Sequence, residues 1–398
     1  DIEFGTRDAF PEERFVGNYQ FMNPVVIIRD LDLVKNITVK DFEYFIDHNQ
    51  LFNEDTEPFF GRTLLNLKGQ DWKDMRSSLS PAFTSSKMRN MVPFMVDVGE
   101  QMIHSLKKKI LDSGANFIDV EISDLTTRYA NDVIASCAFG LKVNSHMEEN
   151  NQFYKMGRAV SSFDFKQTII LFLNASFPKL MNRLNISVLS ETIHNFFRSL
   201  VIDTMKDRET RQIIRPDTIH LLMEAKKGKL THDNEPTQNA DAGFATVEES
   251  NLGKKQTNKV WTDDEIIAQA IIFLVAGFET VSSTMTLLLH ELTINPDVQE
   301  KLVQEINQND IKNNGKFDYN SIQQLTYMDM VVSELLRRWP AVPILDRYCT
   351  KDCNIGRPNE KATEDYIVRE GESLQIPTWG IHHDPQYFPN PFKFDPER

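Results

Sequence analysis

One stretch of this sequence places polar side chains in the middle of an apolar run, where they could take part in chemistry. Residues 276–280 read Ala-Gly-Phe-Glu-Thr and follow the apolar residues from Ile266 onward. Gly277 would let a ligand approach the backbone, and the Thr280 hydroxyl could bond back to a carbonyl and bend a helix. Glu279 and Thr280 beside that opening would suit proton delivery to a bound ligand. The residues by themselves favour proton delivery no more than a kinked core helix in which every polar group has a hydrogen-bond partner.

Two further pairs of side chains share a helix face. Glu334 and Arg337 stand three residues apart among apolar neighbours, which favours a partly buried structural ion pair over a weak surface pair. Trp72 and Arg76 stand four apart, where an indole N–H and a guanidinium could grip a carboxylate. An ordinary cation–π stack is the simpler interpretation of the second pair.

The common kinds of zinc site are not predicted. His290 and Glu291 resemble the start of a zinc-protease motif, but Ile294 stands where the second histidine is required. Cys349 and Cys353 lack the spacing and the second half of a zinc site. With Cys137 they are the three cysteines of the chain, an odd and low count that argues against a secreted disulfide framework. A reducing or cytosol-facing compartment is the expectation.

Composition indicates an ordinary globular protein with a large core. The chain has 398 residues, of which 40% are hydrophobic and 26% charged, so disorder, collagen and a multi-span membrane protein are excluded. The net charge of −14 makes general nucleic-acid binding a poor interpretation. The 27 phenylalanines, which carry no polar tip, indicate a deep apolar interior or an apolar pocket.

The elements that must position these residues are mostly helices. Short apolar runs separated by Gly and Pro at 342–380 predict small β-hairpins, and 228–259 reads as a mobile linker. A β-like stretch at 25–28 precedes a short helix, and residues 48–70 read as loop. Helical patterns cover 71–109, 118–141, 149–165, 190–226, 262–294 and 321–338.

The pattern at 262–294 is the strongest of these. Thr262 and Glu265 form a capping-box pattern, and Asn295-Pro296 marks the end. The middle of the helix is apolar on nearly every side except at Gln269. A membrane span would carry Glu279 near its centre at a cost of a few kcal/mol, so we expect a buried central helix.

Taken in order, the motifs resemble those of the cytochrome P450 family of haem-thiolate monooxygenases. The chain has W-x-x-x-R at 72–76, A-G-x-E-T at 276–280, E-x-x-R at 334–337 and F-D-P-E-R at 394–398. The stretch LSPAFTSSKMRNMVPF at 79–94 looks like the microsomal animal enzymes, and most like insect families related to the vertebrate drug-metabolising ones. The resemblance covers essentially the whole chain. It implies one mainly α domain of cytochrome P450 fold over 1–398, with a minor β part.

The resemblance implies haem as the cofactor and a role in holding it for several residues. Trp72, Arg76 and Arg347 would bind the haem propionates. Ala276 and Gly277 would border the haem, with Gly277 opening the oxygen groove.

Roles in proton delivery and in the structural core follow from the same resemblance. Glu279 and Thr280 would deliver protons to dioxygen. Glu334 and Arg337 would hold the core together on the proximal side of the haem, with Arg398 as a third member.

The resemblance also implies a substrate, an electron source and a biological setting. The parent enzyme would insert one oxygen atom of dioxygen into a lipophilic small molecule, in the manner of xenobiotic metabolism. Electrons would come from NADPH through a flavoprotein reductase. The substrate pocket would be lined by apolar side chains: Leu65, Ile272, Val275, Ala276, Val342 and Pro343.

Some parts of the family pattern are expected outside this sequence. The iron-ligating cysteine of the family lies in a glycine-rich loop after P-E-R-F, so the ligand is expected beyond Arg398. None of Cys137, Cys349 and Cys353 is assigned that role. The chain is expected to be truncated at both ends, without the membrane anchor and inactive by itself. The parent would lie at the cytosolic face of the endoplasmic reticulum membrane.

Two other functions remain open at the level of sequence. One is a haem-free truncated product without enzymatic activity. The other is a haem-thiolate peroxide isomerase, which needs no reductase; the Glu279–Thr280 pair argues against it.

Overall fold

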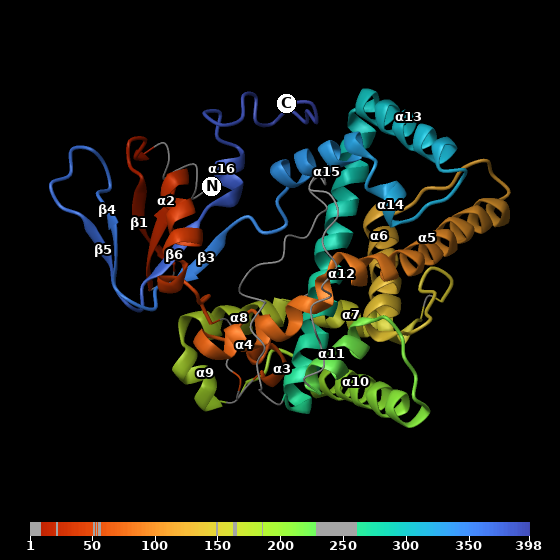
Figure 1. Ribbon diagram of the computed structural model, residues 1–398, viewed down its shortest axis with the longest axis horizontal. Helices are drawn as coiled ribbons and strands as arrows, with labels where there is room; N and C mark the ends of the chain where they lie inside the picture. The colour runs from red at the N-terminus through yellow and green to blue at the C-terminus, as the bar shows by residue number, and fades with distance from the viewer. Residues whose placement is uncertain are drawn as a thin grey trace.

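The computed structural model shows a mainly helical protein with small sheets at one side, as the sequence predicts (Figure 1). It describes residues 9–20, 23–50, 52, 54, 57–148, 150–161, 165–184, 186–227 and 261–398. The linker predicted at 228–259 lies outside the described residues.

The long helix α12 (Asp263–Ile294) runs through the centre of the helical part (Figure 1). The predicted capping box is present, because Glu265 N donates to Thr262 Oγ1 while the Glu265 carboxylate accepts from Thr262 N. The helix ends at Asn295, before Pro296. By length and composition α12 could cross a membrane, but half of its most apolar window is buried inside the protein. The expectation of a central helix is therefore confirmed.

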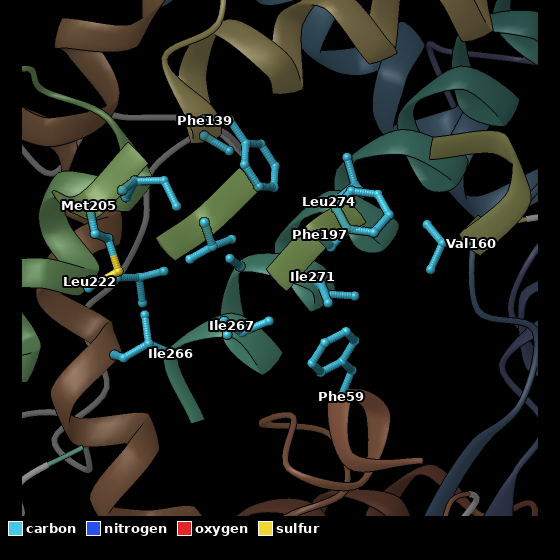
Figure 2. Packing of buried hydrophobic residues seen from close by; sticks show 14 of the residues in the cluster. Phe59, Phe139, Val160, Phe197, Met205, Leu222, Ile266, Ile267, Ile271 and Leu274 are labelled. Carbon is cyan, nitrogen blue, oxygen red and sulfur yellow. The ribbon is translucent and has the colours of Figure 1, made fainter. Parts of the chain in front are cut away.

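The N-terminal half of α12 forms one side of the main core. Figure 2 shows Ile266, Ile267, Ile271 and Leu274 of α12 among side chains from other helices, Phe197 included. These five side chains are buried, and Ile267, Ile271, Leu274 and Phe197 are 0% exposed. Burying apolar surface of this extent is the main driving force for the helical assembly. The core helices around α12 are α3 (Pro58–Gly61), α6 (Ile122–Ile134), α7 (Gln152–Ser161), α10 (Glu191–Arg211) and α11 (Thr218–Lys226).

Two of the predicted helical patterns are each split in two. The pattern at 71–109 becomes α4 (Gly69–Leu79) and α5 (Ser85–Ser113), joined by a 3-10 turn that contains Pro81. The pattern at 190–226 is interrupted after α10, where Gln212 takes a left-handed conformation with φ of 55°. In both cases the apolar spacing continues across the break, so periodicity alone did not show it.

Among the remaining helical segments, α2 and η1 pack with the strands in a second apolar cluster, and α13 and α15 contribute to a third. The sequence patterns did not assign α8, α9 or α13. A π-turn, η4, continues α6, and α3 forms a single turn inside the range predicted as loop. The segments are α2 (Leu31–Lys35), η1 (Asn36–Lys40), η2 (Phe42–Tyr44), η3 (Ser80–Phe83), η4 (Ala135–Phe139), α8 (Phe165–Ser176), α9 (Pro178–Leu184), α13 (Pro296–Lys312), α14 (Tyr319–Ile322), α15 (Thr326–Arg338) and α16 (Thr378–His382).

The strands form one four-stranded and one two-stranded sheet. The four-stranded sheet has the order β1-β2-β6-β3, in which β2 and β6 are parallel and the other pairs are antiparallel. Of the hairpins predicted at 342–380, β4 and β5 pair as one, whereas β3 and β6 pair within the larger sheet. The strands are β1 (Phe15–Gln20), β2 (Asn23–Ile28), β3 (Leu345–Tyr348), β4 (Cys353–Gly356), β5 (Tyr366–Val368) and β6 (Ser373–Ile376).

Candidate functional site

The polar residues predicted on the long helix lie where the core stops covering α12. Ala276, Glu279 and Thr280 are exposed, whereas Leu274 is 0% and Phe278 1% exposed. Spacings of three and four residues place Ala276, Glu279 and Thr280 on one side of the helix. A helix that is buried along its N-terminal half thus presents a carboxylate and a hydroxyl on an open face, which we call the distal face.

The Thr280 side chain bonds back to its own helix, as expected. Its Oγ1 donates a hydrogen bond to the carbonyl oxygen of Ala276. Thr284 Oγ1 donates in the same way to the Thr280 carbonyl, at 2.6 Å. Because the hydroxyl proton of Thr280 is directed to Ala276, the lone pairs of Oγ1 remain able to accept a hydrogen bond from a group on the distal face.

Close packing between α6 and α12 accounts for the glycine at position 277. A Cβ atom built at this position would lie 2.7 Å from Cδ1 and 3.5 Å from Cγ1 of Ile134, at the end of α6. Real carbon contacts do not come that close, so any larger residue would push α6 and α12 apart or displace the Ile134 side chain. The structure therefore explains the glycine by close helix packing, and its predicted role in an oxygen groove stays a prediction.

Trp72 and Arg76 lie on α4, where the guanidinium is exposed. The Trp72 ring is half-buried and packs against Phe42, with ring centroids 6.0 Å apart. Within the described part of the chain, Arg76 makes no ion pair and no cation–π contact, so the simpler stacking interpretation of this pair is wrong. An exposed guanidinium beside an indole is free to bind an anion.

Arg347 on β3 is a partly buried cation without a carboxylate of its own. Its Nη1 donates to the Asp346 carbonyl oxygen at 2.7 Å, and its buried Nε has no hydrogen-bond partner. The Asp346 carboxylate is taken by His48 Nδ1 at 2.9 Å and by Asn49 N at 2.7 Å. Burial lowers the pKa of Arg347, against the opposing effect of Asp346, which means that the site disfavours the cation until an anion reaches it. A guanidinium with an unpaired Nε here and an exposed one at Arg76 fit the two carboxylates of haem.

Glu334, Arg337 and Arg398 form a buried ion cluster, in which α15 meets the last residues of the chain. Arg337 Nε lies 2.7 Å from Glu334 Oε2, and Arg398 Nε lies 3.0 Å from Glu334 Oε1. The side chains of Glu334 and Arg337 are only 3% and 7% exposed. Arg337 also donates to the carbonyl oxygens of His382 and Pro391, at 2.7 and 2.8 Å. The cluster thus joins α15, α16 and the 389–398 segment.

A second buried carboxylate was missed by the sequence analysis. Glu291 on α12 is 0% exposed and accepts a hydrogen bond from Trp339 Nε1 at 2.7 Å. Arg338 Nε lies 3.1 Å from the same carboxylate, and Asn295 Nδ2 lies 3.3 Å from it. The sequence analysis considered Glu291 only as part of a zinc motif. Its apolar neighbours on α12 were the available signal that this charge is buried and must have a partner.

The predicted pocket residues fall into three groups. On α12, Ile272 is buried and Val275 is half-buried. Leu65 is 59% exposed on the loop after α3, and the next residue back, Leu64, donates its N–H to Gln269 of α12 at 2.9 Å.

Val342 and Pro343 make up the third group and are exposed after α15. The Pro343 carbonyl accepts from Trp379 N at 3.0 Å. Hydrogen bonds therefore bring the Leu65 loop to α12, while the third group is anchored to α16.

The cysteines of this chain are poor ligands in their present surroundings. All three are buried and unpaired. Burial raises the pKa of Cys137 to about 12 and that of Cys353 to about 11, so both stay neutral thiols at physiological pH. The assignment of the iron to none of them stays a prediction.

Comparison with known proteins gives one family for nearly the whole chain. The model of the cytochrome P450 family matches residues 12–398. Cytochrome P450 9e2 of Blattella germanica is 43% identical over 396 residues, which cover 97% of this chain and 71% of the relative. In Drosophila melanogaster, probable cytochrome P450 9f2 is 39% identical and covers 97% and 72% of the two chains, and probable cytochrome P450 6a13 is 35% identical. The relatives are insect enzymes, as the motifs indicated, and the chain belongs to the cytochrome P450 family of haem-thiolate monooxygenases.

Proposed function

We propose that this protein hydroxylates a lipophilic small molecule with electrons that NADPH supplies through a flavoprotein reductase. The reaction consumes the substrate C–H, one dioxygen, one NADPH and one proton, and it yields the alcohol, water and NADP⁺. One oxygen atom of dioxygen enters the product and the other leaves as water. Family membership supports the reaction class, and the residues of the distal face support the finer assignment.

The observation that carries the proposal is the change along α12 from buried apolar side chains to exposed polar ones. In the N-terminal half of α12, the side chains of Ile267, Ile271 and Leu274 are fully buried in the core. Within one turn the helix opens, and Glu279 and Thr280 stand exposed beside apolar Ala276. A proton-carrying pair next to an apolar surface is what oxygen activation near a lipophilic substrate requires.

Each group of residues has a separate task in this proposal. Haem, when bound, supplies the redox-active iron at which dioxygen is activated. Arg76 and Arg347 would hold its carboxylates, and the Trp72 indole N–H would donate a second hydrogen bond to the carboxylate held by Arg76. Thr280, whose own proton is bonded to the Ala276 carbonyl, would accept a hydrogen bond from a group on the distal face, and Glu279 would exchange protons with solvent.

The pocket and the ion cluster complete the assignment. Apolar side chains exclude water from the reacting centre and favour lipophilic substrates: Leu65, Ile272, Val275, Ala276, Val342 and Pro343. Glu334, Arg337 and Arg398 hold α15 against the C-terminal segment, which we place on the proximal side of the haem. We place the enzyme at the cytosolic face of the endoplasmic reticulum membrane, in keeping with a membrane-bound reductase.

The test is isotopic. The enzyme that includes the cysteine loop expected beyond Arg398 is loaded with haem and incubated with a flavoprotein reductase and NADPH under ¹⁸O₂. The lipophilic probes include testosterone and lauric acid. We expect a hydroxylated product that carries one ¹⁸O atom and forms only when NADPH is present.

Two outcomes would contradict the proposal. Product that forms from an organic peroxide without NADPH or reductase, with both peroxide oxygens retained, would indicate the isomerase. A haem-loaded enzyme that consumes NADPH but transfers no ¹⁸O to any probe would remove the lipophilic-substrate assignment.

A further inference from the structure

Gln269 is the one polar side chain in the buried, apolar stretch of α12 from Ile266 to Phe278. We propose that it is a positioning residue: it fixes the loop that carries Leu65 against α12 and so limits which bulky ligands fit over the distal face. The inference rests on the proposed function, because it assumes that Leu65 and the distal face border the substrate pocket.

The Gln269 side-chain amide forms hydrogen bonds with the backbone of the loop at two points. Its Oε1 accepts the N–H of Leu64 at 2.9 Å, and its Nε2 donates to the carbonyl of Arg62 at 2.8 Å. The side chain is 0% exposed, and Nε2 also lies 3.3 Å from the Glu265 carbonyl of its own helix. A side-chain amide that both accepts from and donates to one short segment imitates the pairing of a neighbouring strand. It fixes the segment in distance and in register.

The segment before and within this loop is anchored elsewhere as well. Glu57, which precedes α3, is 1% exposed and accepts from the N–H groups of Val188 and Leu189 before α10. Asn66 Nδ2 donates to the carbonyl of Gly61 at 3.0 Å, which closes the chain between them into a turn. Loss of the Gln269 contacts would therefore free Arg62 and Leu64 from α12 while the Glu57 anchor before α3 stays in place.

Within this well-held loop, Leu65 is the apolar side chain that remains uncovered. Phe59, Phe60 and Thr63 are buried at 2%, 5% and 2% exposure, but Leu65 is 59% exposed. An apolar side chain this exposed on an anchored loop is positioned for a ligand rather than for the core.

The anchoring point lies directly beside the distal face. Gln269, Ile272 and Ala276 follow one another at spacings of three and four, so they share one side of α12. The loop covers this side at Gln269, and the side is exposed at Ala276. The length of α12 left open for a ligand is thus determined by where the loop is fastened.

A nonpolar residue would fill the same volume but would leave the Leu64 N–H and the Arg62 carbonyl without partners. Buried, unpaired backbone groups are unfavourable, so the loop would move to reach water. Gln269→Leu should therefore displace Leu65 without disturbing Arg76, Arg347 or the Glu334 cluster.

The experiment uses the haem-loaded enzyme and two ligands of different size. Imidazole binds haem iron through nitrogen and reports on the iron alone, whereas clotrimazole carries a bulky triaryl group that must also fit the pocket. For Gln269→Leu we expect clotrimazole affinity to change by roughly tenfold, the effect of losing about one well-made buried hydrogen bond. The affinity for imidazole should stay within about twofold of that of the unmodified enzyme, because the substitution does not touch the iron site. Deuterium uptake of the 62–66 amides should rise.

Controls separate loop positioning from general damage. Gln304→Leu makes the same change on an exposed part of α13, where Nε2 donates to Glu300 Oε1 at 2.9 Å, and should alter the affinity for neither ligand. Leu65→Ala should change clotrimazole affinity without raising deuterium uptake at 62–66. If Gln269→Leu does not bind haem, Gln269→Asn, whose shorter amide cannot reach both loop groups, takes its place.

The inference is overturned if both ligands weaken equally, or if neither affinity nor exchange changes. These outcomes are independent of the proposed function, since ¹⁸O transfer by the unmodified enzyme is measured separately.

Discussion

At the scale of single residues, the firmest feature is the Glu334 carboxylate, because every polar group around it has a partner. It accepts from Arg337 and from Arg398, and Asp395 N donates to its Oε1 at 3.0 Å. Two guanidinium groups share one carboxylate, and carbonyl oxygens of His382 and Pro391 take further N–H groups of Arg337. A buried cluster of this kind stabilises only while it is complete.

Glu334→Ala should therefore prevent haem loading rather than slow turnover. The change strands the Arg337 charge in a buried site, at a cost of about 3–5 kcal/mol. The measurement is the ratio of haem to soluble protein after expression.

The matched control is Glu397→Ala in the same C-terminal segment, whose partner Lys301 lies 2.8 Å away at the surface. That exposed pair is screened by water and should contribute little to stability. Haem-loaded Glu334→Ala protein with reduced activity would contradict the structural assignment.

The contacts of a functional residue could be predicted from the sequence only where its partner stood a few positions away on the same helix. Glu334 and Arg337 share a helix face, so their pairing was visible in the sequence. Glu291 meets Arg338 and Trp339 from another helix, and no local spacing reveals a contact between elements so far apart in the chain. For Trp72, the sequence could not show that its ring packs against Phe42, which lies 30 residues earlier in the chain.

At the scale of elements, local end signals decided which helices could be predicted. The bounds of α12 were found because Thr262 and Glu265 form a complete cap. The helix α13 was missed because Pro296 was taken only as a stop, although proline is also favoured in the first turn of a helix. The break between α4 and α5 was missed because apolar periodicity continues past Pro81.

The contact between α6 and α12 can be tested at Gly277. Gly277→Ala should destabilise the fold by about 1–3 kcal/mol, because the new Cβ would lie 2.7 Å from Ile134 Cδ1. Ile134→Val removes that Cδ1 atom. In the Ile134→Val background Gly277→Ala should be neutral or stabilising, since alanine favours a helix over glycine by about 1 kcal/mol.

Urea unfolding of the two single variants and the double variant gives the coupling between the two positions. Strictly additive effects would show that Gly277 is not required by this contact.

At the scale of the whole molecule, the parallel pairing of β2 with β6 joins the beginning of the chain to its C-terminal part. This pairing supports our proposal that residues 1–398 form a single domain. The net charge of −14 is unevenly distributed, because Lys68, Lys73, Arg76, Lys87 and Arg89 gather around α4 and the start of α5. Three of the five have partners within the protein: Lys73 pairs with Glu43 at 2.7 Å, Lys68 Nζ lies 4.9 Å from the Tyr348 ring centroid, and Arg89 lies 5.2 Å from that of Tyr319. Arg76 is assigned to the haem.

Lys87 is thus the better candidate for contact with an acidic reductase. Lys87→Glu should slow electron transfer from the reductase and weaken its dependence on salt, since rim charges act mainly on association. Lys108→Glu, an exposed lysine near the other end of α5, is the matched control and should leave the rate unchanged. Stopped-flow reduction of the haem gives the rate. An equal loss of peroxide-driven turnover in Lys87→Glu would show that the lysine supports folding instead.

The central claim, that the open face of α12 controls protons during oxygen activation, is tested most directly by peroxide release per NADPH consumed in Thr280→Ala. Removing the hydroxyl that bonds to Ala276 should raise this ratio severalfold, because reduced oxygen then leaves without reaching the substrate. Thr293→Ala removes the same kind of back-bond, at 2.7 Å to Leu289, near the far end of the helix and should not change it. A ratio in Thr280→Ala equal to that of the unmodified enzyme, with haem content intact, would contradict the role given to this face.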